Sequence, residues 1–136
     1  MIHTTQDPRV IAGQGTVALE MLSQVQGKLD VIVLPVGGGG LISGCSTVIR
    51  AICPGVKIVG AKPAAINDRK VDQFYQNKPK ISKDEYTVCD GTRDVIGVKT
   101  WPIINNNVDD ILTVSDVEVA KGILHKQLKL LINLLF

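Results

Sequence analysis

The sequence predicts an α/β domain in which a parallel β-sheet and its flanking helices form three layers. Two observations lead to this prediction. Short apolar runs rich in β-branched residues alternate along the chain with segments whose apolar residues recur at helical spacing. Strands that alternate with helices pair in parallel, because each helical connection returns the chain to the end of the sheet at which the previous strand began, so successive strands run in the same direction. The 136 residues are expected to form a single unit, residues 1–136.

The first half of the chain contains two expected helices and one expected strand. A helix is expected over residues 16–25, after a loop over residues 10–15, because apolar residues share one face at Ala18, Met21, Leu22 and Val25. The unbroken apolar run at residues 31–34 is typical of a strand buried on both faces. A second helix is expected to begin near Leu41 and to end at Pro54 and Gly55.

The second half repeats the alternation. Residues 56–61 and 109–114 are expected to be strands, with a helix over residues 66–75 and a polar surface loop over residues 77–88. Ser115 and Glu118 have the spacing of a capping box, which predicts the start of a final helix. That helix carries apolar residues at Val117, Ala120, Ile123, Leu124, Leu128, Leu131 and Leu135.

Composition excludes several classes of function. The 15 Lys and Arg nearly balance the 13 Asp and Glu, and no basic stripe suggests nucleic acid or an anionic membrane as a partner. Cys45, Cys53 and Cys89 are an odd number without a C-x-x-C pair, which favours reduced thiols in a cytoplasmic protein over a disulfide framework or zinc site. The start lacks the pattern of a signal peptide, and no apolar run reaches the ~18 residues of a membrane span.

The segment P-V-G-G-G-G-L-I-S-G at residues 35–44 is the strongest indication of chemistry. It follows an expected strand and opens an expected helix, where α/β sheets bind their ligands. Successive glycine N–H groups next to a helix N-terminus suit a phosphate. The segment lacks the G-K-[ST] ending of a P-loop and the spacing and acidic residue of a dinucleotide-binding fingerprint. The alternative is a flexible glycine-rich turn.

Three stretches together make the pattern specific. The tetraglycine segment resembles the phosphate loop of fold-type II pyridoxal-phosphate (PLP) enzymes. Upstream, residues 7–20 (D-P-R-V-I-A-G-Q-G-T-V-A-L-E) resemble serine racemases and threonine dehydratases. Downstream, residues 90–91 (D-G), 100–104 (T-W-P-I-I) and 108–111 (V-D-D-I) resemble serine racemase in family order. The resemblance implies part of the large domain of such an enzyme.

The resemblance also implies roles for particular residues. The backbone N–H groups of the glycine segment would hold the PLP phosphate, and Asp90 and Gly91 would lie beside the cofactor ring. The implied cofactor-binding residues are Gly37, Gly38, Gly39, Gly40, Leu41 and Gly91. Lys129 falls at a position that contributes to a nucleotide effector site between subunits in serine racemases, but an ordinary surface lysine is the preferred interpretation.

The sequence also departs from the family. No segment matches the S-F-K-x-R-G stretch with the Schiff-base lysine, so no catalytic residue is assigned. The family's divalent cation would meet Lys62, Asp68 and Lys99. Lysine is a poor partner for Mg²⁺ or Ca²⁺, which prefer oxygen ligands, so a metal is not expected. We hypothesise instead that the Lys62 ammonium pairs with Asp68 and replaces the ion's charge.

The leading hypothesis from the sequence is a PLP-dependent racemase or ammonia-lyase that acts on serine or threonine, from a family of homodimers. Racemisation and β-elimination share one carbanion and cannot be separated here. The resemblance covers well under half of a family member, and the isolated chain is expected to be inactive because it lacks the Schiff-base lysine. The alternative is a non-catalytic remnant that binds phosphate or a full-length relative.

Overall fold

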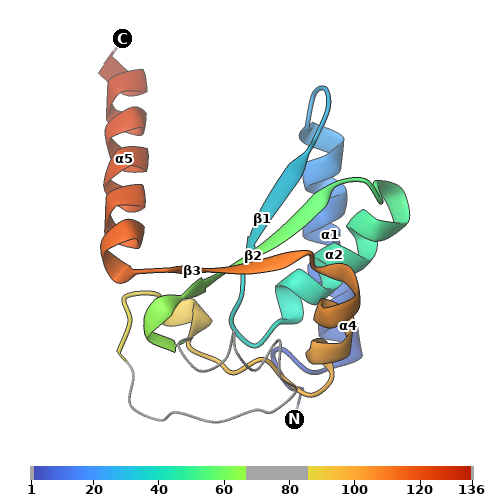
Figure 1. Cartoon of the computed structure of the whole chain (residues 1–136). Helices are drawn as coiled ribbons and strands as arrows, with labels where there is room; N and C mark the ends of the chain where they lie inside the picture. Colours follow the sequence, from blue (N-terminus) through green and yellow to red (C-terminus); the bar gives the residue numbers. More distant parts are fainter. Residues whose placement is uncertain (1, 67–85, 136) are drawn as a thin grey trace.

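The computed structural model describes residues 2–66 and 86–135, and its centre is a three-stranded parallel sheet (Figure 1). The strands are β1 (Val31–Pro35), β2 (Lys57–Pro63) and β3 (Asp110–Val114), in the order β1-β2-β3. Both pairings are parallel, with Val33 opposite Val59 and Ala61 opposite Leu112. The predicted α/β class with a parallel sheet and flanking helices is therefore confirmed.

Four α-helices in the described ranges accompany the sheet: α1 (Pro8–Gln24), α2 (Gly40–Ile52), α4 (Thr100–Asn107) and α5 (Asp116–Leu135). Two short 3₁₀ turns lie at Ala64–Ile66 and Asp90–Thr92. Helices α1, α2 and α4 pack together beside the sheet, whereas α5 extends away from it (Figure 1). No helix in the described part of the chain is long and apolar enough to cross a bilayer.

Helix α1 begins eight residues earlier than predicted, so the expected loop over residues 10–15 is wrong. The Asp7 carboxylate accepts a hydrogen bond from the Arg9 backbone N–H at 2.9 Å, and Pro8 occupies the first turn. An aspartate cap followed by proline is a strong helix start, because it satisfies a free N–H and removes another. Glycines within the first half of α1 had obscured this signal.

Close packing of α1 against α2 explains one glycine in each helix, Gly15 of α1 and Gly44 of α2. A Cβ at Gly44 of α2 would overlap the carbonyl oxygen of Ile11 and lie 2.6 Å from the nitrogen of Gly15. A Cβ at Gly15 would lie 3.0 Å from the carbonyl oxygen of Gly44. The two backbones therefore meet where neither helix has a side chain, and this contact fixes α2 and the glycine turn before it.

The core lies between α2 and one face of the sheet. Ile32 and Leu34 of β1 are each 4% exposed, whereas Val31 is 48% and Val33 59% exposed on the other face. The expectation that β1 is buried on both faces is therefore wrong for this chain. Alternate residues of a strand point to opposite faces, and no described helix covers the second face. The core cluster comprises Ala18, Ile32, Leu34, Val36, Ile42, Cys45, Ile49, Val56, Ile58, Ile104, Val108 and Ile111.

The capping box that starts α5 is confirmed. The Ser115 backbone N–H donates to the Glu118 carboxylate at 2.8 Å, and the Glu118 N–H donates to the Ser115 hydroxyl oxygen at 3.3 Å. The expected apolar stripe is exposed at Val117 and Ile123 (63% and 53%), because α5 runs away from the sheet. Helix α4 was not predicted. Most of the expected helix at 66–75 and loop at 77–88 lies outside the described residues.

Candidate functional site

The glycine turn connects the carboxyl end of β1 to the amino end of α2. Gly39 is the N-cap of α2 and has φ 91°, a left-handed conformation that side-chain-bearing residues rarely adopt. A Cβ at Gly39 would lie 2.7 Å from Cδ1 of Ile104 and 2.8 Å from the hydroxyl oxygen of Thr100. Both the backbone conformation and the close approach of α4 therefore require glycine at this position.

The turn presents backbone N–H groups that lack acceptors within the described part of the chain. No hydrogen bond from the N–H of Gly37, Gly38 or Gly39 reaches another described residue. The N–H groups of Gly40 and Leu41 belong to the first turn of α2, where a helix has no internal acceptors. Because Gly38, Gly39 and Gly40 are buried, these donors need a partner. Together with the positive end of the helix dipole, they form a site suited to an anion.

Two other segments pack against the turn. A Cβ at Gly37 would lie 3.0 Å from Cα of Thr92 and 3.3 Å from the carbonyl oxygen of Gly91. Gly91 therefore lies beside the glycine turn, although its contact with a ligand stays a prediction. On another side, a Cβ at Gly38 would lie 2.7 Å from the hydroxyl oxygen of Thr5. These neighbours lie so close that a side chain at Gly37 or Gly38 would collide with them.

The carbonyl oxygen of Gly38 is bound by groups that the sequence analysis missed. The Thr100 hydroxyl donates to it at 2.8 Å, and the Gly97 N–H donates to it at 3.2 Å. The side-chain amide of Gln6 lies 3.5 Å from the same oxygen. Thr100 belongs to a motif that carried the family resemblance and Gln6 directly precedes another, but nothing local in the sequence linked either to the turn.

Lys62, which the sequence analysis placed at an expected cation position, is a core residue. It is 1% exposed, and its Nζ lies 3.3 Å from the carbonyl oxygens of both Val36 and Asp94. Its ammonium thus joins the end of β1 to the segment after Gly91. Lys99 is exposed, and Asp68, with the proposed pairing to Lys62, lies outside the described residues. Among residues 2–66 and 86–135, no group of three His, Cys, Asp or Glu could hold a metal.

Two ion pairs away from the glycine turn stabilise the fold, one between α2 and the start of β3 and one at the start of α1. Arg50 of α2 contacts Asp109 at 2.6 Å, and the same carboxylate accepts the Ile58 backbone N–H at 2.6 Å. Burial acts to raise the pKa of Asp109, but the hydrogen bonds from Ile58 and Arg50 outweigh it and hold the pKa below its usual value. At α1, hydrogen bonds from the Arg9 side chain and backbone lower the pKa of Asp7 to about 2.

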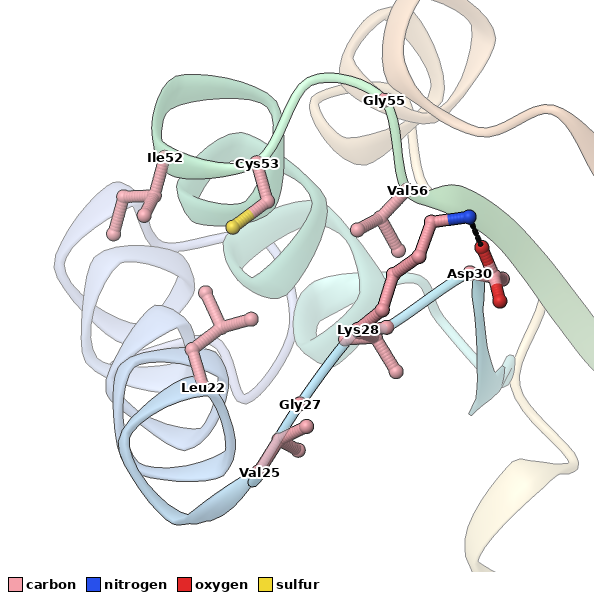
Figure 2. Close-up of a pocket in the computed structure, with 10 residues that line it drawn as sticks. Leu22, Val25, Gly27, Lys28, Asp30, Ile52, Cys53, Gly55 and Val56 are labelled. Carbon is pink, nitrogen blue, oxygen red and sulfur yellow. Dashed lines mark ion pairs between the residues drawn. The ribbon is translucent and has the colours of Figure 1, made fainter.

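A groove lies at the opposite, amino end of the strands (Figure 2). Figure 2 shows Leu22 of α1 and Ile52 and Cys53 at the end of α2 facing this groove. Lys28 and Asp30 at its margin pair with each other at 2.6 Å. The groove is therefore mainly apolar, and its lining residues offer no row of donors comparable to that of the glycine turn.

The candidate site therefore comprises the five N–H groups of Gly37, Gly38, Gly39, Gly40 and Leu41, with Gly91 beside them. Lys62 contacts the residue just before the turn, because its Nζ lies 3.3 Å from the carbonyl oxygen of Val36. Lys129 is exposed on α5, as the preferred interpretation predicts. The arrangement is suited to an anion such as a phosphate group, and no described side chain in it is placed as a nucleophile.

Comparison with known proteins shows which family the chain belongs to. The model of a family described as "pyridoxal-phosphate dependent enzyme" matches residues 1–126. Human serine racemase is 43% identical over 98% of this chain and 39% of its own length. The L-threo-3-hydroxyaspartate ammonia-lyase of Saccharomyces cerevisiae is 45% identical over 89% of this chain and 37% of its own length.

Solved structures agree. The structure of maize serine racemase is similar with a TM-score of 0.78 and 37% identity, over 85% of this chain and 36% of that chain. The serine racemase of Dictyostelium discoideum has a TM-score of 0.77 with 37% identity, over 88% of this chain and 38% of its own. The chain thus spans about two fifths of the length of these relatives. These similarities confirm the resemblance predicted from the motifs.

Proposed function

The chain belongs to the family of pyridoxal-phosphate dependent enzymes, and we propose from this premise that it forms the phosphate-binding part of the large domain of an amino-acid racemase or ammonia-lyase. Its substrates would be serine, threonine or a close hydroxyamino acid. Relatives named as serine racemase, hydroxyaspartate ammonia-lyase and threonine deaminase support this substrate class.

The observation that carries the proposal is the row of buried N–H groups without acceptors among the described residues, at Gly38, Gly39 and Gly40. A buried donor without a partner costs roughly 1–3 kcal/mol, so a site with several of them is built for a ligand that accepts hydrogen bonds. A phosphate dianion accepts several at once and is also attracted by the helix dipole. The site therefore fits the phosphate group of PLP.

In this proposal the chain binds and orients the cofactor. The N–H groups of Gly37 to Leu41 hold the phosphate, and the backbone at Gly91 borders the space beside Gly37. When bound, PLP withdraws electrons from the substrate and makes its Cα–H acidic, which permits racemisation or loss of a β-hydroxyl. The tightly packed glycines would hold the phosphate end in one position and would thereby help to orient the cofactor.

The Schiff-base lysine is not assigned to any residue of this chain. We therefore propose that residues 1–136 alone bind the phosphate group but do not catalyse the reaction. Homodimers are common in the family, and we propose homodimer formation only for a protein that also contains the catalytic lysine.

The second candidate is a non-catalytic protein that binds phosphate or associates with a full-length relative. The exposed apolar residues Val31 and Val33 of β1 and Leu112 of β3 favour association, because they form an uncovered face of the sheet in the described part of this chain. Both candidates include the phosphate site. In the first candidate it serves an enzyme whose catalytic lysine lies on another segment, and in the second it serves a protein without catalytic activity.

The test is a titration of the ¹⁵N-labelled chain with inorganic phosphate, followed by NMR. The amide signals of residues 37–41 are expected to move together at millimolar phosphate, since all five N–H groups face one ligand. Gly39→Ala should remove the response, because its Cβ would strain the left-handed backbone and strike α4.

Gly55→Ala is the matched control. Gly55 lies in the turn at the other end of α2, and a Cβ there meets nothing within 4 Å. This variant should respond to phosphate like the unmodified chain. Signals of residues 37–41 that stay still while others move would contradict the proposed site.

A further inference from the structure

We propose that Thr100 is a positioning residue that aims the Gly39 N–H at the bound phosphate by holding the carbonyl of Gly38 on the opposite side. The inference rests on the proposed phosphate site and adds a residue from α4 to it. Thr100 contacts the backbone of the turn and does not itself contact the ligand in this account.

The geometry begins with one carbonyl oxygen. Gly38 O accepts the Thr100 hydroxyl at 2.8 Å, while the next contact of that hydroxyl, to the carbonyl oxygen of Gly97, is longer at 3.2 Å. A hydroxyl has one proton, so the shorter contact identifies Gly38 O as its acceptor. Thr100 is fully buried, and water does not compete for this hydrogen bond.

The peptide plane transmits this contact to the site. The carbonyl of Gly38 and the N–H of Gly39 belong to the same planar trans peptide and point in opposite directions. Holding the carbonyl toward α4 therefore turns the Gly39 N–H away from α4. Glycines lack the steric limits that would otherwise keep this peptide from rotating. An external contact such as that from Thr100 is what can keep the donor aligned in the absence of ligand.

Gln6 and Gly97 complete the support. The Gln6 side-chain oxygen accepts the Lys99 backbone N–H at 2.9 Å, and its nitrogen lies 3.4 Å from the Thr100 hydroxyl oxygen. A side chain at Gly97 would overlap the Gln6 amide, so glycine is required there. The Gly97 N–H is shared in a three-centre hydrogen bond: it donates to the Thr100 hydroxyl oxygen at 3.1 Å as well as to the Gly38 carbonyl oxygen at 3.2 Å. The hydroxyl is thus oriented by accepting on one side and donating to Gly38 on the other.

The experiment compares Thr100→Val, which keeps the shape and removes the hydroxyl, with Thr100→Ser, which keeps the hydroxyl. In the ligand-free chain, Thr100→Val should shift the carbonyl ¹³C signal of Gly38 and the amide signal of Gly39. Its affinity for inorganic phosphate should fall about tenfold, the effect of misaligning one hydrogen bond to a charged group. Thr100→Ser should restore both readouts.

Thr47→Val is the matched control. It removes a threonine hydroxyl of α2 that donates to the backbone carbonyl oxygen of Ser43, in the same helix, at 2.8 Å. It should change neither readout. If the unmodified chain binds no phosphate, the proposed function fails, and the ligand-free signals alone then judge the inference. An unchanged Gly38 carbonyl signal in Thr100→Val, or unchanged phosphate affinity in a chain that binds it, overturns the role of Thr100.

Discussion

The contact between α1 and α2 predicts opposite effects for two glycine-to-alanine changes. Gly44→Ala places a methyl group against the carbonyl oxygen of Ile11 and 2.6 Å from the nitrogen of Gly15. Both are backbone atoms, so relief requires the two helices to separate. Gly13→Ala changes a glycine of α1 where a Cβ meets nothing within 4 Å.

The magnitudes follow from two competing terms. Alanine in place of a helix glycine stabilises by about 0.5–1 kcal/mol, and this is the whole effect expected for Gly13→Ala. Overpacking costs about 1–3 kcal/mol, and contacts with rigid backbone put Gly44→Ala at the upper end. The net change for Gly44→Ala is therefore a loss of about 2 kcal/mol, or a fall in Tm of roughly 6–10 °C for a chain of this length.

Thermal and urea unfolding, followed by circular dichroism at 222 nm, measure both variants against the unmodified chain. Because the α1–α2 contact fixes the glycine turn, Gly44→Ala should also weaken phosphate binding, whereas Gly13→Ala should leave it unchanged. A Gly44→Ala chain as stable as the unmodified one would refute the close helix contact. Equal destabilisation by Gly13→Ala would show that helix glycines matter here for a reason other than packing.

Four further predictions concern charge, metal and the cofactor. The stabilisation from Asp109, held by Arg50 and Ile58, should be complete above the usual carboxyl pKa of 3.8 and lost as the pH falls through its lowered folded-state pKa; acid unfolding curves of Asp109→Asn should be flatter in this range. Lys62→Glu should destabilise by about 3–5 kcal/mol in urea unfolding, because it replaces a buried ammonium that donates to two carbonyl oxygens with a carboxylate that those oxygens repel. Millimolar Mg²⁺ should not change the Tm of the unmodified chain. After incubation with PLP and reduction with borohydride, mass spectrometry should find no lysine that is modified in preference to the others. Specific modification of one lysine would contradict the proposal that this chain lacks the Schiff-base lysine.

Elements that depend on contiguous residues could be predicted. The strands at β1 and β3, the helix α2 after the glycine turn and the Ser115–Glu118 capping box all follow from local apolar periodicity or from hydrogen bonds within one turn. Helix α1 is the partial exception, because its glycines weaken the local signal. The missed helix α4 begins T-W-P, where proline is compatible with the first turn but does not by itself indicate a helix.

The sequence by itself thus determined the three strands, their parallel pairing and the place of the glycine turn between a strand and a helix, because these follow from neighbouring residues and from the chain's periodicity. Only the tertiary structure decided how the turn is held. Thr100 meets the Gly38 carbonyl across 62 positions, Gln6 meets Thr100 across 94, and Lys62 becomes buried between Val36 and Asp94. The physical reason is that such contacts depend on how the helices pack against the sheet, which no local pattern of residues specifies.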